Sequence, residues 1–336
     1  MCLDIKRFPK IDLHCHLDGS MRPQTLLDLL KEQGQTDIPS LDEIEMRMRV
    51  NADCKSLVDY LKRFDLPLLV LQTEEALYQV AKELVFDAAA DGVIYLEVRF
   101  APQLHREKGL SLDTIVAAVQ RGLADGAAQA GIDTGLLLCC MRHQTVEQGL
   151  EVVEVARQFH GNGVVGIDLA GDELSFSPLL HHAVFQKAQA YDIPYTIHAG
   201  ESAGALSIKE ALLLGARRIG HGVRLLEDPK LIPYFLQHDI GMELCPTSNL
   251  QTKAVPSWDA YPLRRFLDEG LAVTVNTDNR TVSDITLTKE YELLIQHLGL
   301  QESDFIRMLE NAIRISFAGE SVKKRLMRMV APVKTE

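Results

Sequence analysis

Two patterns of hydrophobic and polar positions alternate along the chain. Short apolar runs rich in β-branched residues have the character of buried strands. The runs cover residues 10–16, 93–100, 135–142, 164–171, 195–200, 217–221, 241–246 and 272–278. The segments between them carry apolar residues at helical spacing. The pattern therefore predicts strands that alternate with helices over most of the sequence.

Alternating strands and helices pair in parallel through right-handed crossovers, and eight such units close a (β/α)8 barrel, the TIM barrel. We therefore predict an α/β fold of this type, with residues 1–336 as a single domain. A doubly wound open sheet is the alternative. It is disfavoured because no G-x-G-x-x-G follows an early strand. In addition, acidic residues lie at the ends of many of the runs, whereas an open sheet would gather them at one topological switch point.

Two segments are longer than the barrel requires. Residues 37–90 exceed one crossover helix, so we predict extra helices inserted after the first strand, above the barrel mouth. Residues 285–330 keep a helical pattern and predict a helical C-terminal segment. Within the barrel, residues 207–216 predict a helix in which Ser207 and Glu210 have capping-box spacing and Gly215 marks the end.

The composition is that of an ordinary globular protein. Apolar residues make up 46% and charged residues 24%, and a net charge of −12 would repel a phosphate backbone, so we expect no nucleic-acid partner. The N-terminal residues lack the apolar core of a signal peptide, and no apolar stretch is long enough to span a membrane. We expect a cytoplasmic protein without a membrane partner. The sequence leaves its oligomeric state open.

The cysteines are expected to be reduced thiols. None forms a C-x-x-C pair, and several lie in apolar runs such as LLLCCM, where they serve as small hydrophobic residues. We therefore predict neither disulfides nor cysteine zinc ligands. The six residues are Cys2, Cys15, Cys54, Cys139, Cys140 and Cys245.

Five predicted strands end in residue types that bind metals or transfer protons. These are His14 and His16 on the first strand, Gly171, Asp172 and Glu173 after the fourth, His198 and Glu201 after the fifth, His221 after the sixth, and Asp278 after the eighth. Chemistry in barrels of this kind gathers at the C-terminal ends of the strands. A solvated edge strand would explain residues 10–18 alone, but it does not explain the recurrence on separate strands.

Two imidazoles at i and i+2, a third from another strand and a carboxylate from a fourth form a first shell for a divalent metal such as zinc. Because such a metal lowers the pKa of a bound water from 15.7 to about 7, hydrolysis is the expected chemistry. Six further histidines lie in helical or loop context and are expected to be structural or surface residues without partners. They are His105, His160, His181, His182, His238 and His297.

The motifs resemble those of the adenosine deaminase family from about residue 9 to residue 330. The most specific ones occur in the family's order: H-C-H-L-D-G at 14–19, D-L-A-G-D-E at 168–173, H-A-G-E at 198–201, R-I-G-H-G at 218–222 and N-T-D-N at 276–279. The resemblance implies that one zinc ion per chain is bound by His14, His16, His198 and Asp278. It also implies zinc-dependent hydrolytic deamination of adenosine and 2′-deoxyadenosine to the inosines and ammonia, a step of purine salvage.

The resemblance further implies residue roles. Glu201 would protonate N1 of the purine, and His221 would orient the attacking water and stabilise charge. Contacts to the purine nucleoside, the expected small-molecule partner, would come from Gly171 to N3, Asp18 to the ribose 5′-hydroxyl, Leu61 and Phe64 in an apolar lid, and Asn279 to N7. The family usually has a second aspartate where Asn279 stands, and an amide always carries the donor that N7 requires.

Three alternatives remain open. The substrate could be a related 6-aminopurine: adenine, an N6-substituted adenine nucleoside or a 5′-modified adenosine. A two-metal hydrolase would usually place a bridging lysine at the end of the fourth strand, where VVGIDLAG has none. A non-enzymatic, nucleoside-binding or secreted member of the fold would not need Glu201 and His221. The cytidine deaminase class is excluded, because its P-C-x-x-C signature is absent.

Overall fold

Eight parallel strands form the centre of the computed structural model, which describes residues 4–51 and 53–331. Two four-stranded sheets run in the orders β1-β2-β3-β4 and β5-β6-β7-β8. Single bridges join Ile167 to Tyr195 and Cys15 to Asp278, so the two sheets close into one ring. The barrel prediction is confirmed, and the open sheet is wrong. The strands are Lys10–His16, Val93–Phe100, Asp133–Met141, Val164–Ala170, Thr196–Ala199, Arg218–His221, Gly241–Leu244 and Ala272–Val275.

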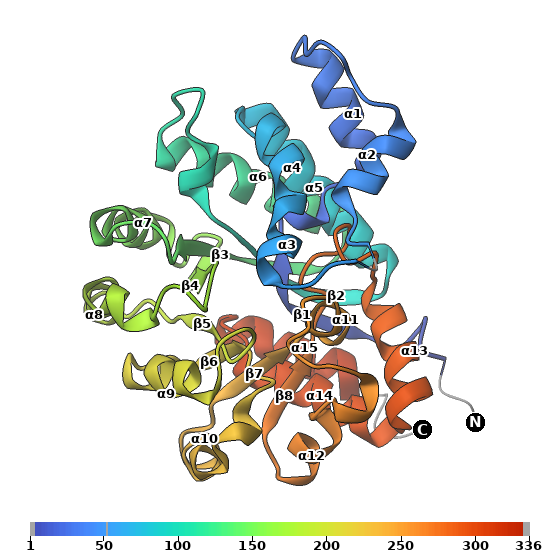
Figure 1. Cartoon of the computed structure of the whole chain (residues 1–336), viewed down its shortest axis with the longest axis vertical. Coiled ribbons are helices and arrows are strands. Elements are labelled where there is room, and N and C mark those ends of the chain that lie inside the picture. Colours follow the sequence, from blue (N-terminus) through green and yellow to red (C-terminus); the bar gives the residue numbers. More distant parts are fainter. Residues whose placement is uncertain (1–3, 52, 332–336) are drawn as a thin grey trace.

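Helices surround this ring (Figure 1). They pack on the strands through apolar faces, as α14 (Glu302–Ile315) illustrates. Its buried positions include one apolar stripe, which packs on β8 and β1: Phe305, Met308, Leu309 and Ala312. The helices outside the strands are α5 (Glu74–Ala90), α6 (Leu112–Ala130), α7 (Val146–Phe159), α8 (His182–Ala190), α9 (Ala205–Leu213), α10 (Ile232–His238), α12 (Leu263–Asp268) and α14 (Glu302–Ile315).

The predicted insertion after the first strand is present. It contains α1 (Pro23–Glu32), α2 (Leu41–Met48), α3 (Leu57–Leu61) and α4 (Asp65–Val70). The Tyr60 hydroxyl on α3 lies 2.7 Å from the Ser283 hydroxyl, which ties the insertion to the loop after β8. The short helix α11 (Pro246–Gln251) follows β7, and α13 (Leu287–Leu298), α14 and α15 (Glu320–Val330) form the predicted helical end of the chain.

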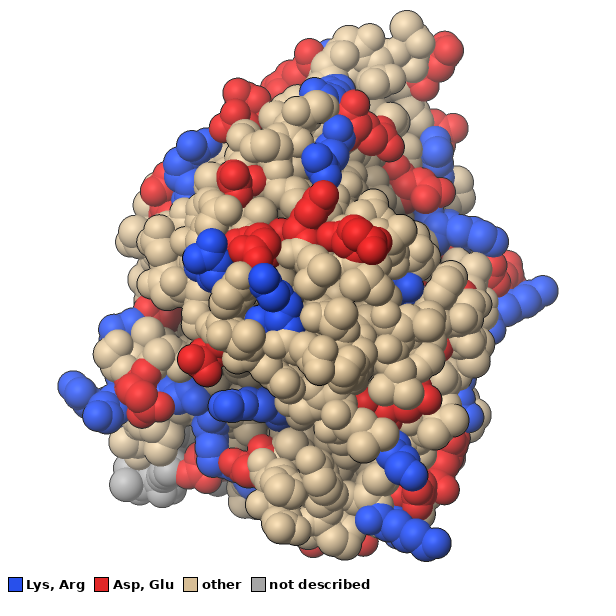
Figure 2. Space-filling model, turned by 90° about the vertical axis from the view of Figure 1, so that its left-hand side faces the viewer, with Lys and Arg blue, Asp and Glu red and all other residues tan. Residues whose placement is uncertain are grey.

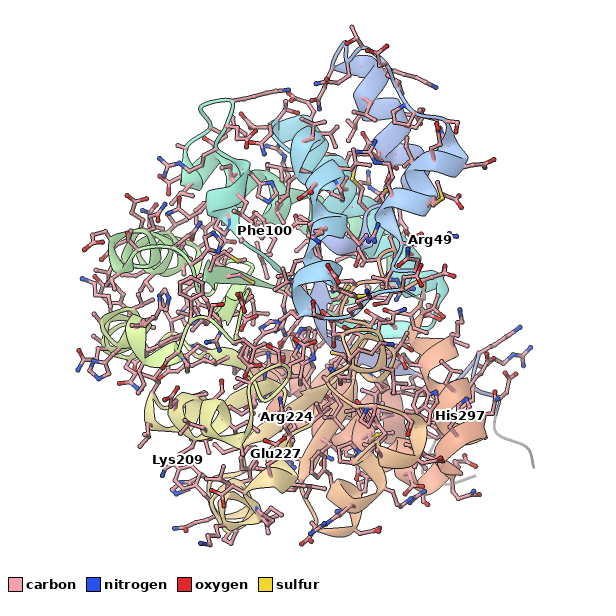
Figure 3. The ribbon with its side chains drawn as sticks, in the orientation of Figure 1. Arg49, Phe100, Lys209, Arg224, Glu227 and His297 are labelled. Carbon is pink, nitrogen blue, oxygen red and sulfur yellow. The ribbon has the colours of Figure 1, made fainter. Side chains whose placement is uncertain are left out.

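The predicted capping box at Ser207 is wrong. Helix α9 begins two residues earlier, at Ala205, and Ser207 is buried inside it. The Glu227 carboxylate accepts the Ala205 backbone N–H at 3.3 Å, so a side chain from another loop serves the first turn (Figure 3). Glu210 instead accepts the Ser177 hydroxyl at 2.7 Å. The predicted stop holds, because Gly215 follows the helix with a φ of +88°.

The prediction of reduced thiols is confirmed for the cysteines that the structure describes. Cys15, Cys54, Cys139, Cys140 and Cys245 are free and buried, whereas Cys2 lies outside the described residues. Burial raises the pKa of the Cys15 and Cys140 thiols to about 12. These thiols therefore stay protonated at neutral pH.

The outer surface carries charges of both signs. On the face shown in Figure 2, acidic and basic side chains are interspersed, so that face has no broad basic patch of the kind that binds nucleic acid. Within the described part of the chain, no helix is long and apolar enough to cross a membrane.

One buried carboxyl makes the stability of the fold depend on pH. Glu290 on α13 is fully buried and accepts the Thr247 backbone N–H at 3.0 Å. Burial raises its pKa to about 8, whereas an exposed glutamate titrates near about 4.3. Between these values the folded chain binds more protons than the unfolded chain, so the free energy of unfolding decreases as the pH rises.

We therefore expect Glu290→Gln, which keeps an acceptor for Thr247 and cannot ionise, to gain thermal stability relative to the wild type as the pH rises from 5 to 9. Melting temperatures of both proteins across this range measure the effect. Parallel curves would show that Glu290 does not titrate in the folded protein.

Candidate active site

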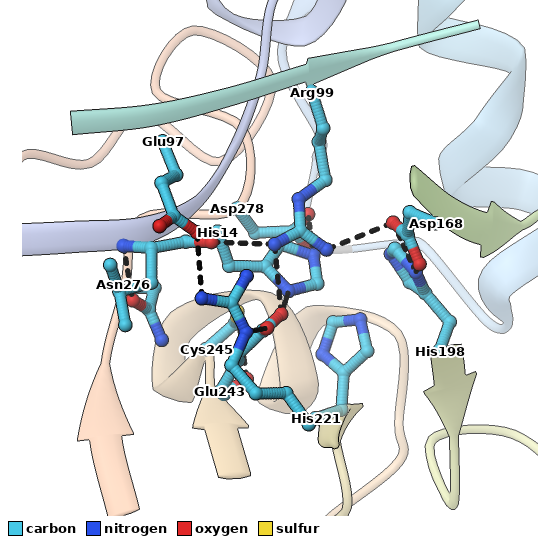
Figure 4. Close-up of polar contacts among 12 residues, drawn as sticks. His14, Glu97, Arg99, Asp168, His198, His221, Glu243, Cys245, Asn276 and Asp278 are labelled. Carbon is cyan, nitrogen blue, oxygen red and sulfur yellow. Dashed lines mark hydrogen bonds and ion pairs between the residues drawn. The ribbon is translucent and has the colours of Figure 1, made fainter. Parts of the chain in front are cut away.

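A layer of fully buried charged side chains fills the barrel below the strand ends (Figure 4). Arg99 on β2 lies at its centre, with Nη1 2.9 Å from Asp168 Oδ2 and Nη2 2.8 Å from Glu243 Oε2. Arg218 on β6 lies 2.6 Å from the other oxygen of Glu243 and 2.7 Å from Glu97. Although burial opposes ionisation, Arg99 and Arg218 hold the pKa of Glu243 far below its usual value.

The carboxylates of this layer orient two imidazoles. His14 Nδ1 lies 2.8 Å from Glu243 Oε2, and His198 Nδ1 lies 3.0 Å from Asp168 Oδ2. A carboxylate accepts, so each Nδ1 carries the proton and donates. The opposite nitrogen, Nε2, is left with a free lone pair on each ring. This is the arrangement that carboxylates impose on metal-binding histidines.

The four predicted metal ligands meet at one point. His16 Nε2 lies 3.3 Å from His198 Nε2, and Asp278 Oδ1 lies 3.4 Å from Nε2 of both His14 and His16. His14 Nε2 is buried and has no hydrogen-bond partner among the described residues. Ligand atoms of a tetrahedral ion with bonds of 2.0–2.1 Å lie about 3.4 Å apart. The donor set therefore fits a divalent metal ion, which would neutralise the converging lone pairs.

Closure of the barrel between β1 and the end of β8 holds Asp278 in place. The His16 N–H donates to the Asp278 carbonyl at 2.7 Å, and the Asp278 N–H donates to the His14 carbonyl at 2.8 Å. Asp278 has a φ of +59° and His221 a φ of +61°, a left-handed conformation that non-glycine residues rarely adopt. Strained backbone of this kind is typical of functional sites, where the surrounding structure enforces it.

Beside the ligand cluster, a hydrogen-bonded chain ends at Glu201. The Tyr261 hydroxyl donates to Asn249 Oδ1 at 2.9 Å, so the Asn249 amide nitrogen donates to His221 Nδ1 at 3.0 Å. The proton of a neutral His221 ring is then on Nε2, which lies 3.6 Å from Glu201 Oε2. The Thr252 hydroxyl donates to Glu201 Oε1 at 3.0 Å. His221 and Glu201 thus face each other across the site.

The surroundings of Glu201 favour the protonated form of its carboxyl group. Burial, together with the charges of Asp278 and Glu173, raises its pKa well above the usual value. Glu173 also fixes the loop that carries it, because its carboxylate accepts the backbone N–H of Glu201 at 3.0 Å, of Ser202 at 2.7 Å and of Ala203 at 3.0 Å. A buried acid on a rigid loop is suited to proton donation.

A cavity of about 310 Å³ opens above these groups. Its lining includes the predicted site residues His16, Asp18, Leu61, Phe64, Gly171, His198, Glu201, His221, Asp278 and Asn279. His14 lies beneath the cavity and is fully buried. Tyr60, Leu57 and Leu68 of the inserted helices add apolar surface. The structure therefore brings all the predicted site residues together.

Two glycines allow close approach at the cavity. Gly171 has a φ of +106°, which disfavours a side chain and leaves its backbone open to a ligand. A Cβ on Gly19 would lie 1.9 Å from Asn279 Oδ1, so only glycine leaves room for that amide.

Of the six histidines expected to be structural or surface residues without partners, two are buried and do have polar partners. His105 is fully buried, and its Nε2 lies 3.4 Å from Asp18 Oδ1. His181 is also buried, with Nε2 3.1 Å from the Arg142 carbonyl, and is structural. The other histidines of that group are exposed, as expected: His160, His182, His238 and His297.

The buried charged layer around Arg99 was not predicted from the sequence. The sequence does contain a signal for this layer. Glu97 and Arg99 stand two positions apart in an otherwise largely apolar strand, and Asp168 is the single charged residue in VVGIDLAG. Charges at such positions point into the barrel and require partners there.

Comparison with known proteins agrees with this geometry. The adenosine deaminase family model matches residues 9–333. An adenosine deaminase of Enterococcus faecalis is 43% identical over 97% of both chains. One of Clostridium kluyveri is 40% identical over 94% of this chain and 91% of the relative. The chain belongs to the adenosine deaminase family.

Solved structures of several deaminases and of an amidohydrolase share the fold. An adenine deaminase from Arthrobacter aurescens superposes with a TM-score of 0.90 at 27% identity, covering 98% of this chain and 99% of that one. The N6-methyl-AMP deaminase of Arabidopsis thaliana gives 0.86 at 30% identity, covering 98% of both chains. An amidohydrolase from Burkholderia ambifaria with bound zinc gives 0.89 at 25% identity, covering 98% and 91%. The fold is thus common to deaminases that are named for different substrates.

We expect Glu243→Gln to weaken metal binding about 10- to 100-fold, because His14 loses the charged acceptor that fixes its tautomer. Competition with a chromophoric chelator measures the affinity. Glu97→Gln is the matched control, since Glu97 lies in the same buried layer and pairs with Arg218. Equal losses in both variants would show that the layer acts only through stability.

Proposed function

We propose that this protein catalyses the hydrolytic deamination of adenosine and 2′-deoxyadenosine to inosine and 2′-deoxyinosine, with release of ammonia. One zinc ion per chain would be held by His14, His16, His198 and Asp278. The observation that carries the proposal is the convergence of these four donors beside the buried Glu201. Support comes from relatives named adenosine deaminase and from the zinc in the Burkholderia ambifaria structure.

The residues divide the chemistry between them. A bound zinc ion lowers the pKa of a coordinated water to about 7, so hydroxide is available at neutral pH. Glu201 donates its proton to N1 of the purine, and C6 becomes electrophilic. His221 donates a hydrogen bond from Nε2 to the attacking oxygen and stabilises its charge. Once the oxygen has bonded to C6, its hydroxyl proton passes to the amino group, the C6–N bond breaks, and ammonia leaves as the C6 carbonyl of the product forms.

The remaining site residues hold the nucleoside in the cavity. The Gly171 backbone N–H donates to N3, and the Asn279 amide donates to N7 without needing protonation. Asp18 accepts the ribose 5′-hydroxyl. Leu61 and Phe64 of the inserted helices cover the apolar face of the ligand, in a cavity that they line together. We also propose that residues 1–336 act as one catalytic domain around this single site.

The charge of the cavity favours a nucleoside over a nucleotide. None of the described residues that line it is lysine or arginine, whereas Asp18 and Asp172 add negative charge. A 5′-phosphate there would meet repulsion and no cationic partner. This observation argues against AMP-type substrates, although the Arabidopsis relative is named for one. Asp18 at the cavity wall likewise favours a ribose-bearing substrate over free adenine.

Ultraviolet absorbance with metal-loaded protein tests the function. We expect turnover of adenosine and 2′-deoxyadenosine, with N6-methyladenosine, AMP and adenine at least about 100-fold slower in kcat/KM. Absence of turnover with every 6-aminopurine would refute deamination. A preference for AMP would refute the nucleoside assignment.

Glu201→Gln serves as the test of the proton donor. Because the amide cannot supply the N1 proton, kcat should drop about 100-fold or more while the metal content stays unchanged. Near-normal rates in this variant would contradict the role of Glu201.

A further inference from the structure

We infer that His105 is a positioning residue that holds Asp18 in place for the ribose 5′-hydroxyl, an inference that rests on the proposed function. The two side chains come from different strand ends. Asp18 begins the short 3-10 helix η1 (Asp18–Ser20) after β1, and His105 ends η3 (Pro102–His105) after β2. Asp18 lines the cavity, and His105 lies behind it.

The contact joins two buried polar atoms that lack other partners. His105 Nε2 lies 3.4 Å from Asp18 Oδ1, and neither atom has a hydrogen-bond partner elsewhere in residues 4–51 and 53–331. His105 is 0% exposed and Asp18 is 5% exposed. Buried polar atoms of this kind are costly unless they satisfy each other. The contact with His105 therefore occupies Oδ1 of Asp18.

The other ring nitrogen fixes the orientation of the imidazole. His105 Nδ1 lies 2.7 Å from the Leu71 carbonyl oxygen, which can only accept, so Nδ1 carries a proton. Leu71 directly follows α4, so the same ring is tied to the inserted helices above the cavity. The Phe100 ring packs against the His105 ring, with centroids 5.6 Å apart. The ring is therefore held on both nitrogens and cannot turn away from Asp18.

This arrangement has a consequence for the substrate. With one oxygen of Asp18 held by His105, the second oxygen remains for a ligand in the cavity. The cavity lining has no lysine or arginine among its described residues, so no cation of that kind competes for the Asp18 carboxylate there. His105 thus keeps a lone carboxylate from turning into solvent and directs it at the 5′ end of the ribose.

Two substitutions separate the two contacts of the ring. In His105→Gln, the amide nitrogen takes the place of Nε2 and keeps a donor toward Asp18. In His105→Asn, the shorter amide takes the place of Nδ1, keeps the donor toward Leu71 and loses the contact with Asp18. His105→Phe retains the ring volume and replaces the Asn variant if that variant does not fold.

The readout is kcat/KM for adenosine divided by kcat/KM for 5′-deoxyadenosine, which lacks the 5′-hydroxyl.

We expect the wild type to favour adenosine and this ratio to fall about tenfold in His105→Asn, mainly through KM, as for a lost hydrogen bond to a charged group. His105→Gln should retain most of the ratio. If His105→Asn keeps the wild-type ratio, or loses activity equally with both substrates, His105 acts only on the fold and the inference is overturned. If the wild type has the same kcat/KM for adenosine and 5′-deoxyadenosine, the inference about His105 is overturned together with the role of Asp18 as the acceptor of the 5′-hydroxyl. A wild type inactive on both overturns the proposed function itself.

Discussion

Arg99 is the side chain on which the site depends. It is fully buried, and its two terminal nitrogens contact Asp168 and Glu243 from strands on either side of the barrel. A charge buried in this way is tolerated only when it is paired and hydrogen-bonded. Barrel closure therefore has to bring these strands to one register. Once it does, two ionised carboxylates lie directly below the imidazoles of His14 and His198.

The rest of the site follows from that layer. The carboxylates keep the protons of both rings on Nδ1 and leave lone pairs at the cavity floor, where Asp278 joins them. Two carboxyl groups in one cavity then lie in different surroundings. Asp278 lies among the imidazoles of the ligand cluster. Glu201 faces carboxylates, and their charge together with burial raises its pKa.

Much of this could be predicted from the sequence, because strand ends converge by topology. The position of each donor at the end of an apolar run predicted which residues meet, and the structure brings them together, while their catalytic roles stay predictions. Contacts set by tertiary packing could not be predicted. Glu227, from another loop, accepts the N–H of the first turn of α9 in place of a capping box at Ser207. His105 lies 3.4 Å from Asp18 although the two residues are 87 positions apart in the sequence.

The buried carboxylates impose one tautomer on the rings of His14 and His198 before any ion binds. Long-range proton–nitrogen NMR correlation spectra of the metal-free protein, labelled at histidine nitrogens, report the tautomer of each ring directly. We expect His14 and His198 to carry their protons on Nδ1, with Nε2 unprotonated. Protons on Nε2 of these rings would contradict it.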